Sequence, residues 1–196
     1  MKTAIFVLLD KYADWEGAYL ASQLNQSKRW NIKTASNQTL ITSIGGFSTQ
    51  VDLRIEDIPE SADLLVLIGG DSWNTDIPAL TDILKNRIQN KKPVGSICGS
   101  VDYLAAHGLL NSRKHTGNSK LLWRNFAEYK NGNHFMLEQS VSDNNLVTAN
   151  GTAALEFTIN VLKMVEFKED QQVERDINLF KLGYYKYVEK YGNPYE

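Results

Sequence analysis

Short apolar runs recur along the chain and predict the buried strands of a sheet. Four of them are bounded by turn residues or charges: Ala4–Leu9, Ile32–Ser36, Asp63–Ile68 and Val94–Ile97. Each is rich in apolar or β-branched residues, which is typical of strands in a parallel sheet with both faces covered.

Helical patterns lie between these runs. Apolar positions from Trp15 to Ser22 recur at the spacing of one helix face, and those from Leu80 to Ile88 do the same, with Pro78 near the start. Strands that alternate with helices indicate βαβ units, a mainly parallel sheet and right-handed crossovers. The sequence therefore predicts an α/β fold.

Other segments break this alternation. Thr39–Leu53 and Phe135–Thr148 each contain a turn between short runs, which predicts two hairpin-like excursions. A helix is expected over Thr152–Phe167, and a helix or helix pair broken near Gly183 over Glu169–Lys190. No repeat or linker appears, so we expect a single domain over residues 1–196.

Composition narrows the class of protein. Hydrophobic residues make up 42% and charged residues 22%, as in ordinary soluble proteins. A net charge of −2 offers no basic face for nucleic acid, and no segment approaches the roughly 20 apolar residues that span a bilayer. One cysteine cannot form an internal disulfide, so we expect a cytoplasmic protein.

That single cysteine, Cys98, stands where a predicted strand ends and a helix begins. The strand Val94–Ile97 runs directly into it, the small residue Gly99 follows, and a helical pattern continues to His107 and Gly108. A nucleophile at a sharp strand-to-helix turn is a nucleophile elbow, and the start of the helix favours the reactive thiolate. A buried structural thiol is the alternative, but the end of a central strand is where open sheets bind ligands.

Four motifs, in order, resemble the DJ/PfpI superfamily, whose fold belongs to the class I glutamine amidotransferase-like type. They are Leu67-Ile68-Gly69-Gly70, Ile97-Cys98-Gly99, Gly108-Leu109-Leu110 with Arg113-Lys114, and the stretch from Leu146 to Phe157. The resemblance covers about Lys2 to Val165. It implies a flavodoxin-like three-layer sandwich with a mainly parallel central sheet, and commonly a homodimer.

The resemblance also implies roles for particular residues. Glu16 matches the glutamate whose carboxyl group contacts the cysteine sulfur in the family. The backbone N–H groups of Gly70 and Gly99 match an oxyanion hole, which must point at the position where negative charge develops. The structural alternatives are a solvated acid in a first helical turn and a turn that requires glycine.

The chain departs from the family at its general base. Hydrolytic members place a histidine some twenty residues after the cysteine, whereas here Asn118 falls at that position and His115 lies three residues earlier. Asparagine cannot accept a proton as a base must. Glutaminase activity is not expected either, because Glu156 has no histidine two residues before it.

These residues predict a cysteine-dependent enzyme acting on a small electrophile, either a reactive aldehyde or an amide. The alternatives are an oxidative-stress sensor that turns nothing over and a binding domain that uses the same pocket. No nucleotide motif or metal-ligand cluster appears, so no cofactor is expected. A homodimer is expected from the resemblance and from aromatic residues assigned to the surface, including Trp73 and Trp123.

Overall fold

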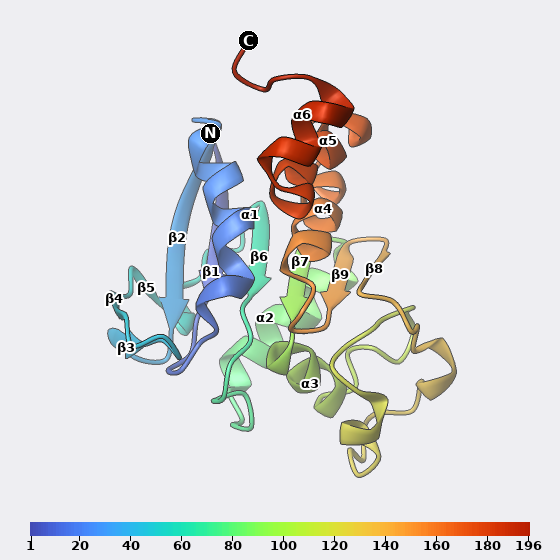
Figure 1. The fold of residues 1–196 in the computed structure, drawn as a ribbon. Helices are drawn as coiled ribbons and strands as arrows, with labels where there is room; N and C mark the ends of the chain where they lie inside the picture. Colours follow the sequence, from blue (N-terminus) through green and yellow to red (C-terminus); the bar gives the residue numbers. More distant parts are fainter.

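The computed structural model describes residues 1–196 and contains a seven-stranded sheet with helices on both faces (Figure 1). The strand order is β5-β2-β1-β6-β7-β9-β8, and every neighbouring pair is parallel except β8 with β9. This arrangement confirms the expected flavodoxin-like fold with a mainly parallel sheet. The strands are β1 (Lys2–Val7), β2 (Trp30–Ser36), β3 (Leu40–Thr42), β4 (Ser48–Gln50), β5 (Leu53–Arg54), β6 (Leu64–Leu67), β7 (Val94–Ile97), β8 (Ser140–Asp143) and β9 (Leu146–Ala149).

Six helices complete the fold, and their ends follow the expected signals. Pro78 occupies the first turn of α2. Gly108, with a φ of 68°, lies just after the C-terminal end of α3. Gly183 separates the last two helices, as expected. The helices are α1 (Asp14–Gln26), α2 (Pro78–Gln89), α3 (Gly99–Ala106), α4 (Ala154–Met164), α5 (Asp170–Leu182) and α6 (Tyr184–Tyr191).

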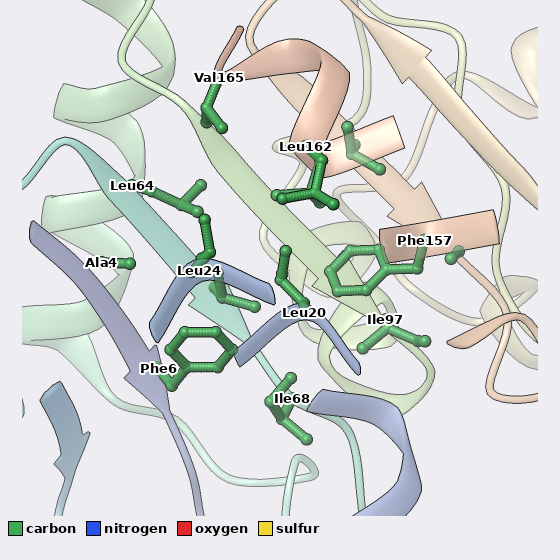
Figure 2. Packing of buried hydrophobic residues seen from close by; sticks show 14 of the residues in the cluster. Ala4, Phe6, Leu20, Leu24, Leu64, Ile68, Ile97, Phe157, Leu162 and Val165 are labelled. Carbon is green, nitrogen blue, oxygen red and sulfur yellow. The ribbon is translucent and has the colours of Figure 1, made fainter. Parts of the chain in front are cut away.

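Two apolar cores, one on each face of the sheet, hold the three layers together. On one face α1 and α4 bury residues such as Leu20 and Phe157 against the strands (Figure 2). Ile177 of α5 belongs to the same core, and α5 packs on α4. On the other face α2 and α3 bury Leu84 and Leu104. Each fully buried leucine contributes about 2 kcal/mol through removal of its surface from water.

Both predicted excursions contain an antiparallel hairpin. Strands β3 and β4 pair outside the main sheet, and β8 and β9 pair across a turn in which Asn144 has a φ of 55°. However, β9 is also a full member of the central sheet, parallel to β7. All four of its residues are buried, because β9 lies between two other strands.

Two tryptophans expected at the surface are buried. Trp73 packs in the core that faces α2 and α3, and its indole N–H donates to the carbonyl of Ile68 at 2.7 Å. Trp123 lies in a cluster with the rings of His115, Tyr129 and Phe135. The expected aromatic surface is therefore confined to the C-terminal tyrosines, of which Tyr185 is 87% exposed.

The strand order reverses direction at β1. The chain passes from β1 to β2 on one side and returns to β6 on the other, so the loops after β1 and β6 diverge at this point (Figure 1). Such switch points, at the carboxyl ends of parallel strands, are where open α/β sheets bind ligands. The longest helices have 13 residues, and none combines the length and apolar character needed to cross a bilayer.

Candidate active site

Cys98 lies at the corner between β7 and α3 with a φ of 61° and a ψ of −129°. This is the positive φ expected of a nucleophile elbow, and it is strained for any residue other than glycine. The turn is held from both sides, because the Cys98 N–H donates to the carbonyl of Ala149 and the Ile97 N–H donates to Ser100 Oγ. Backbone strain at a residue so firmly held marks it as a functional candidate.

Glu16 is brought to the cysteine from the first turn of α1. Its side chain is fully buried, and Oε2 accepts a hydrogen bond from the Gly69 N–H at 2.8 Å. No nitrogen or oxygen donor satisfies Oε1. A Cβ placed on Gly151 would lie 3.0 Å from Oε1 and 2.8 Å from the Cys98 sulfur, so both atoms border the same glycine.

Asn118 also reaches the sulfur. Its Nδ2 donates to Cys98 Sγ at 3.3 Å, and its Oδ1 accepts from the Gly151 N–H at 2.8 Å. Because a backbone N–H can only donate, the atom facing it must be the amide oxygen, and the NH₂ group must face the sulfur. Asn118 therefore acts here as a hydrogen-bond donor.

His115 does not reach Cys98. Its Nδ1 contacts the carbonyl of Arg113 and its Nε2 the hydroxyl of Tyr129, each at 2.8 Å. The backbone pairs with the segment around Phe135, and the ring is fully buried among aromatic side chains, where burial lowers its pKa. His115 therefore does not turn toward the sulfur, because both ring nitrogens are engaged elsewhere.

Gly70 and Gly99 adjoin each other beside the elbow. Gly70 has a φ of 141°, and a Cβ there would lie 2.2 Å from the carbonyl oxygen of Lys11, so only glycine fits. A Cβ on Gly99 would lie 2.8 Å from the Gly70 carbonyl oxygen. The Ala13 N–H donates to the Gly69 carbonyl, and the Asp71 N–H donates to the Lys11 carbonyl. The Gly70 N–H takes part in neither bond and is available to a ligand.

Two pockets flank the elbow. One of about 750 Å³ is lined by Asn118 and by polar residues of the loops around Gln139 and Asn150. The other, of about 490 Å³, begins at Gly70 and Gly99. Neighbours of Cys98 thus line both pockets.

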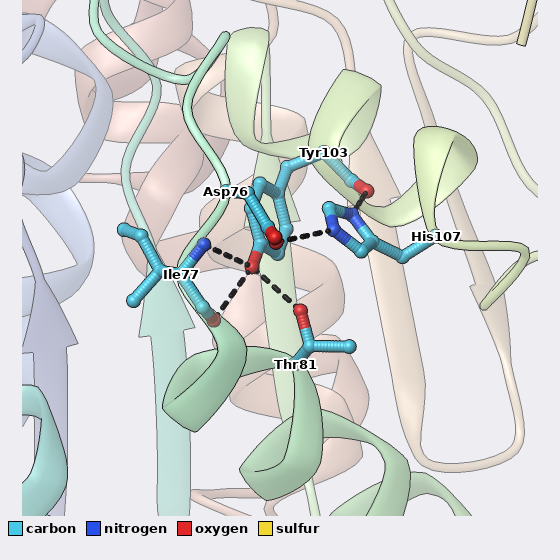
Figure 3. A network of polar contacts seen from close by, with 5 residues as sticks. All are labelled: Asp76, Ile77, Thr81, Tyr103 and His107. Carbon is cyan, nitrogen blue, oxygen red and sulfur yellow. Dashed lines mark hydrogen bonds and ion pairs between the residues drawn. The ribbon is translucent and has the colours of Figure 1, made fainter.

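A polar network that the sequence did not reveal borders the second pocket (Figure 3). His107 lies 2.8 Å from the Tyr103 carbonyl through Nδ1 and 3.2 Å from Asp76 Oδ1 through Nε2. The Tyr103 hydroxyl donates to the carbonyl of Ile77 and contacts Thr81 Oγ1. The network ties the loop after β6, which carries Gly70, to helix α3. No group of three or more His, Cys, Asp or Glu side chains has an arrangement that would hold a metal ion.

Burial dominates the electrostatics of Glu16 and Cys98. It raises the pKa of the Glu16 carboxyl to about 7, against the effect of hydrogen bonds to Cys98 and the Gly69 N–H. Burial, together with the adjacent Glu16 carboxyl, also raises the pKa of the Cys98 thiol, against donation from Asn118 and Gly99. Adjacent negative charges repel, so the pair carries at most one charge near neutral pH.

The position of that charge depends on the donors around each group. Taken separately, a carboxyl pKa of about 7 and a thiol pKa of about 11 would place it on Glu16. At the sulfur, however, the Asn118 amide, the Gly99 N–H and the first turn of α3 converge, whereas one N–H serves Glu16. The partial positive charge of a helix start favours thiolate. Because more donors converge on the sulfur than on the carboxylate, we expect the charge on sulfur.

Sequence reasoning missed Gly151 and Trp15 as parts of this site. Gly151 follows β9 and contacts the sulfur, and the Trp15 indole N–H donates to the Gly151 carbonyl at 3.1 Å. A glycine after a strand reads as an ordinary turn, and the contact joins residues 136 positions apart. No local pattern would have linked them.

Comparison with known proteins places the chain in one family. The model of the DJ-1/PfpI family matches residues 2–164. A Bacillus subtilis relative named "uncharacterized protease YdeA" is 47% identical over 195 residues, which cover 100% of this chain and 99% of the relative. A Pyrococcus abyssi relative named a deglycase is 30% identical over 111 residues, covering 55% and 66%.

A solved structure shows the same architecture. The crystal structure of a thiJ/pfpI family protein from Bacillus anthracis has a TM-score of 0.84 to this chain. The two are 32% identical, and the match covers 96% of this chain and 95% of the other. Together with the elbow at Cys98 and the seven-stranded sheet, these matches establish that the chain belongs to the DJ-1/PfpI family.

Proposed function

We propose that the protein is a cysteine-dependent enzyme that acts on a small reactive aldehyde in the cytoplasm. The observation that carries the proposal is the donor set at Cys98, in which the Asn118 amide, and no histidine, contacts the sulfur at 3.3 Å. A thiolate held by donors adds readily to a carbonyl carbon, and this addition needs no base to activate the nucleophile. The single free cysteine fits a reducing compartment.

The first step is addition of the thiolate to the aldehyde. A carbon–sulfur bond forms as the carbonyl π electrons move to oxygen, and the N–H groups of Gly70 and Gly99 stabilise the oxyanion. Protonated Glu16 then gives its proton to that oxygen, which produces a neutral hemithioacetal and leaves Glu16 as carboxylate. Because burial raises the pKa of the Glu16 carboxyl well above its ordinary value, Glu16 can hold this proton and take one back near neutral pH.

With a 2-oxoaldehyde, the same groups complete a reaction. The Glu16 carboxylate removes the proton from the former aldehyde carbon, and the electrons of that C–H bond move through an enediolate to the neighbouring carbonyl oxygen. The proton returns to the neighbouring carbon, and the hydroxyl proton passes from the first oxygen to the second, which gives a 2-hydroxy thioester. Water cleaves the thioester, releases a 2-hydroxy acid and regenerates the Cys98 thiol. The net change is addition of one water molecule, with no external oxidant or reductant.

Turnover of methylglyoxal tests this function. Wild-type protein is expected to consume methylglyoxal and release lactate, and Cys98→Ala is expected to do neither. The Ser142→Ala variant, in the edge strand β8 away from the elbow, serves as the matched control and should keep wild-type activity. Equal rates for wild type and Cys98→Ala, or no lactate from either, would overturn the proposal.

A second candidate function, an oxidative-stress sensor, is supported by the free Oε1 of Glu16. A protonated carboxyl beside the sulfur is a ready donor to the oxygen atoms of a sulfinate, the second stage of cysteine oxidation. Mass spectrometry after mild peroxide treatment separates the two functions. Oxidation of Cys98 at low peroxide in a protein that consumes no aldehyde would favour the sensor.

A further inference from the structure

Trp15 is the residue of the site whose position the proposed chemistry leaves unexplained. It precedes Glu16 in α1 and is 50% exposed, so burial does not account for its placement. Its indole N–H donates to the carbonyl oxygen of Gly151 at 3.1 Å. Asn150 is tied to Gln139, and the following residues enter α4, so the Trp15 bond is the contact that holds the Gly151 carbonyl.

Gly151 is held from both sides and lies against the reacting atoms. Trp15 holds its carbonyl, and its N–H donates to Asn118 Oδ1 at 2.8 Å. A Cβ at this position would lie 2.8 Å from the Cys98 sulfur. A small displacement of Gly151 therefore changes both the packing against the sulfur and the anchor of the Asn118 amide.

We propose that Trp15 is a positioning residue for Cys98, which acts through Gly151 and Asn118. The indole N–H fixes Gly151, the Gly151 N–H fixes the orientation of the Asn118 amide, and that amide donates to the sulfur. Without the indole N–H, the glycine loses a tether, and the Asn118 NH₂ group spends less time on Sγ. The proposal rests on the role of Cys98 as nucleophile in the proposed function.

Replacing Trp15 does not change the charged groups around Cys98. Glu16 is the titratable group that faces Cys98 from α1, whereas the loops of Gly69, Gly151 and Asn118 present amides to it. Trp15 is uncharged, so its replacement by Phe removes a donor and keeps an aromatic ring without changing the charge of the site. A shift in thiol titration then reports hydrogen bonding to the sulfur.

The test is the pH dependence of iodoacetamide labelling of Cys98. In Trp15→Phe, the labelling rate at pH 7 is expected to fall by a factor of roughly three or more, and the pH profile is expected to move to higher pH. The reason is that a hydrogen bond to a charged group is stronger than a neutral one, so weakening the Asn118 bond destabilises the thiolate more than the thiol. Trp30→Phe is the matched control: Trp30 begins β2 at the opposite end of the sheet, and its indole donates no hydrogen bond. It should label as wild type.

A double-mutant cycle shows whether the effect passes through Asn118. In the Asn118→Ala background, Trp15→Phe is expected to cause no further change, because the donor that it positions is gone. An unchanged profile in Trp15→Phe, or an equal shift in both backgrounds, would overturn the proposal. Labelling requires no turnover, so the predicted shifts in a protein that consumes no aldehyde would refute the proposed function and leave the role of Trp15 intact.

Discussion

At Cys98, a buried carboxyl group and several amide donors surround a sulfur atom that ends a strand and begins a helix. Asn118 and Gly99 stabilise negative charge there, and Glu16 supplies or accepts a proton. A hydrogen bond to a charged group contributes about 1.5–3 kcal/mol, enough to change the thiolate population by roughly tenfold or more. The reactivity of Cys98 therefore depends on residues from α1, from the start of α3 and from the loop that carries Asn118.

Glu16 variants test the shared proton. Glu16→Gln keeps a donor beside the sulfur and should change the apparent thiol pKa modestly, whereas Glu16→Asp is too short to reach and should lose the contact. The measurement is iodoacetamide labelling against pH, with mass spectrometry after mild peroxide. If Glu16→Asp matches wild type in both labelling and oxidation, the pair does not exist.

Asn118 leads to a prediction about peptide cleavage. Relatives of this chain are named as proteases, but Asn118 cannot take the proton that a base must accept or pass it to a leaving amine. We expect weak or no cleavage of casein and aminopeptidase substrates. Robust cleavage that disappears in Cys98→Ala would contradict this expectation.

The sequence could place several of these residues and not others. Cys98, Glu16 and Gly70 were predictable because each follows a recognisable strand, and the carboxyl ends of parallel strands share one edge of the sheet. The direction of the His115 side chain was not, because pairing of its backbone with Phe135 turns the ring into an aromatic cluster. The sequence could predict that Asn118 occupies the position of the family histidine. It could not predict the orientation of the Asn118 amide, because that orientation depends on the hydrogen bond from Gly151.

At the scale of elements, the segment between α3 and β8 carries Asn118 with little regular structure. Its helical content is confined to the short 3₁₀ turns Lys120–Trp123 and Gly132–His134. It is held by the cluster of His115, Trp123 and Phe135. A loop without regular backbone hydrogen bonding depends on side-chain packing of this kind. No hydrophobic periodicity in the sequence predicts such packing. The strands and helices around it were predictable because their periodicity is strong.

His115 makes this segment sensitive to acid. Burial lowers its pKa below the ordinary value of 6.5, so the unfolded chain binds the proton more readily than the folded one. The stability that neutral His115 provides is present above about pH 6.5 and declines as the pH falls below it. The thermal midpoint of wild type should therefore fall more steeply between pH 7 and 5 than that of His115→Gln. Parallel slopes would show that His115 does not titrate on folding.

In the whole molecule, loops from several strands of the sheet gather around the elbow after β7. Residues after β1, β6, β7 and β9 converge at one edge, because parallel strands present their carboxyl ends together. The order of the strands was implied by family resemblance rather than by periodicity, since β5 has only two residues and β9 is paired on both sides. Long-range pairing of this kind leaves no local signal.

We expect a homodimer in solution. Family resemblance motivates this prediction, and exposed aromatic side chains such as Phe47 and Tyr185, at 68% and 87%, are suited to an interface. Light scattering at micromolar concentration should give twice the chain mass of 22.1 kDa. A mass equal to that of one chain would count against it.

The most direct test of the account is the ultraviolet absorbance of the thiolate as a function of pH, taken as the difference between wild type and Cys98→Ala. We predict that thiolate is already present at pH 7 and that Asn118→Ala displaces its appearance to higher pH. Thiolate that appears only above the ordinary thiol pKa of about 8.5, with no change in Asn118→Ala, would place the charge on Glu16 and rule out a reactive thiolate held by Asn118.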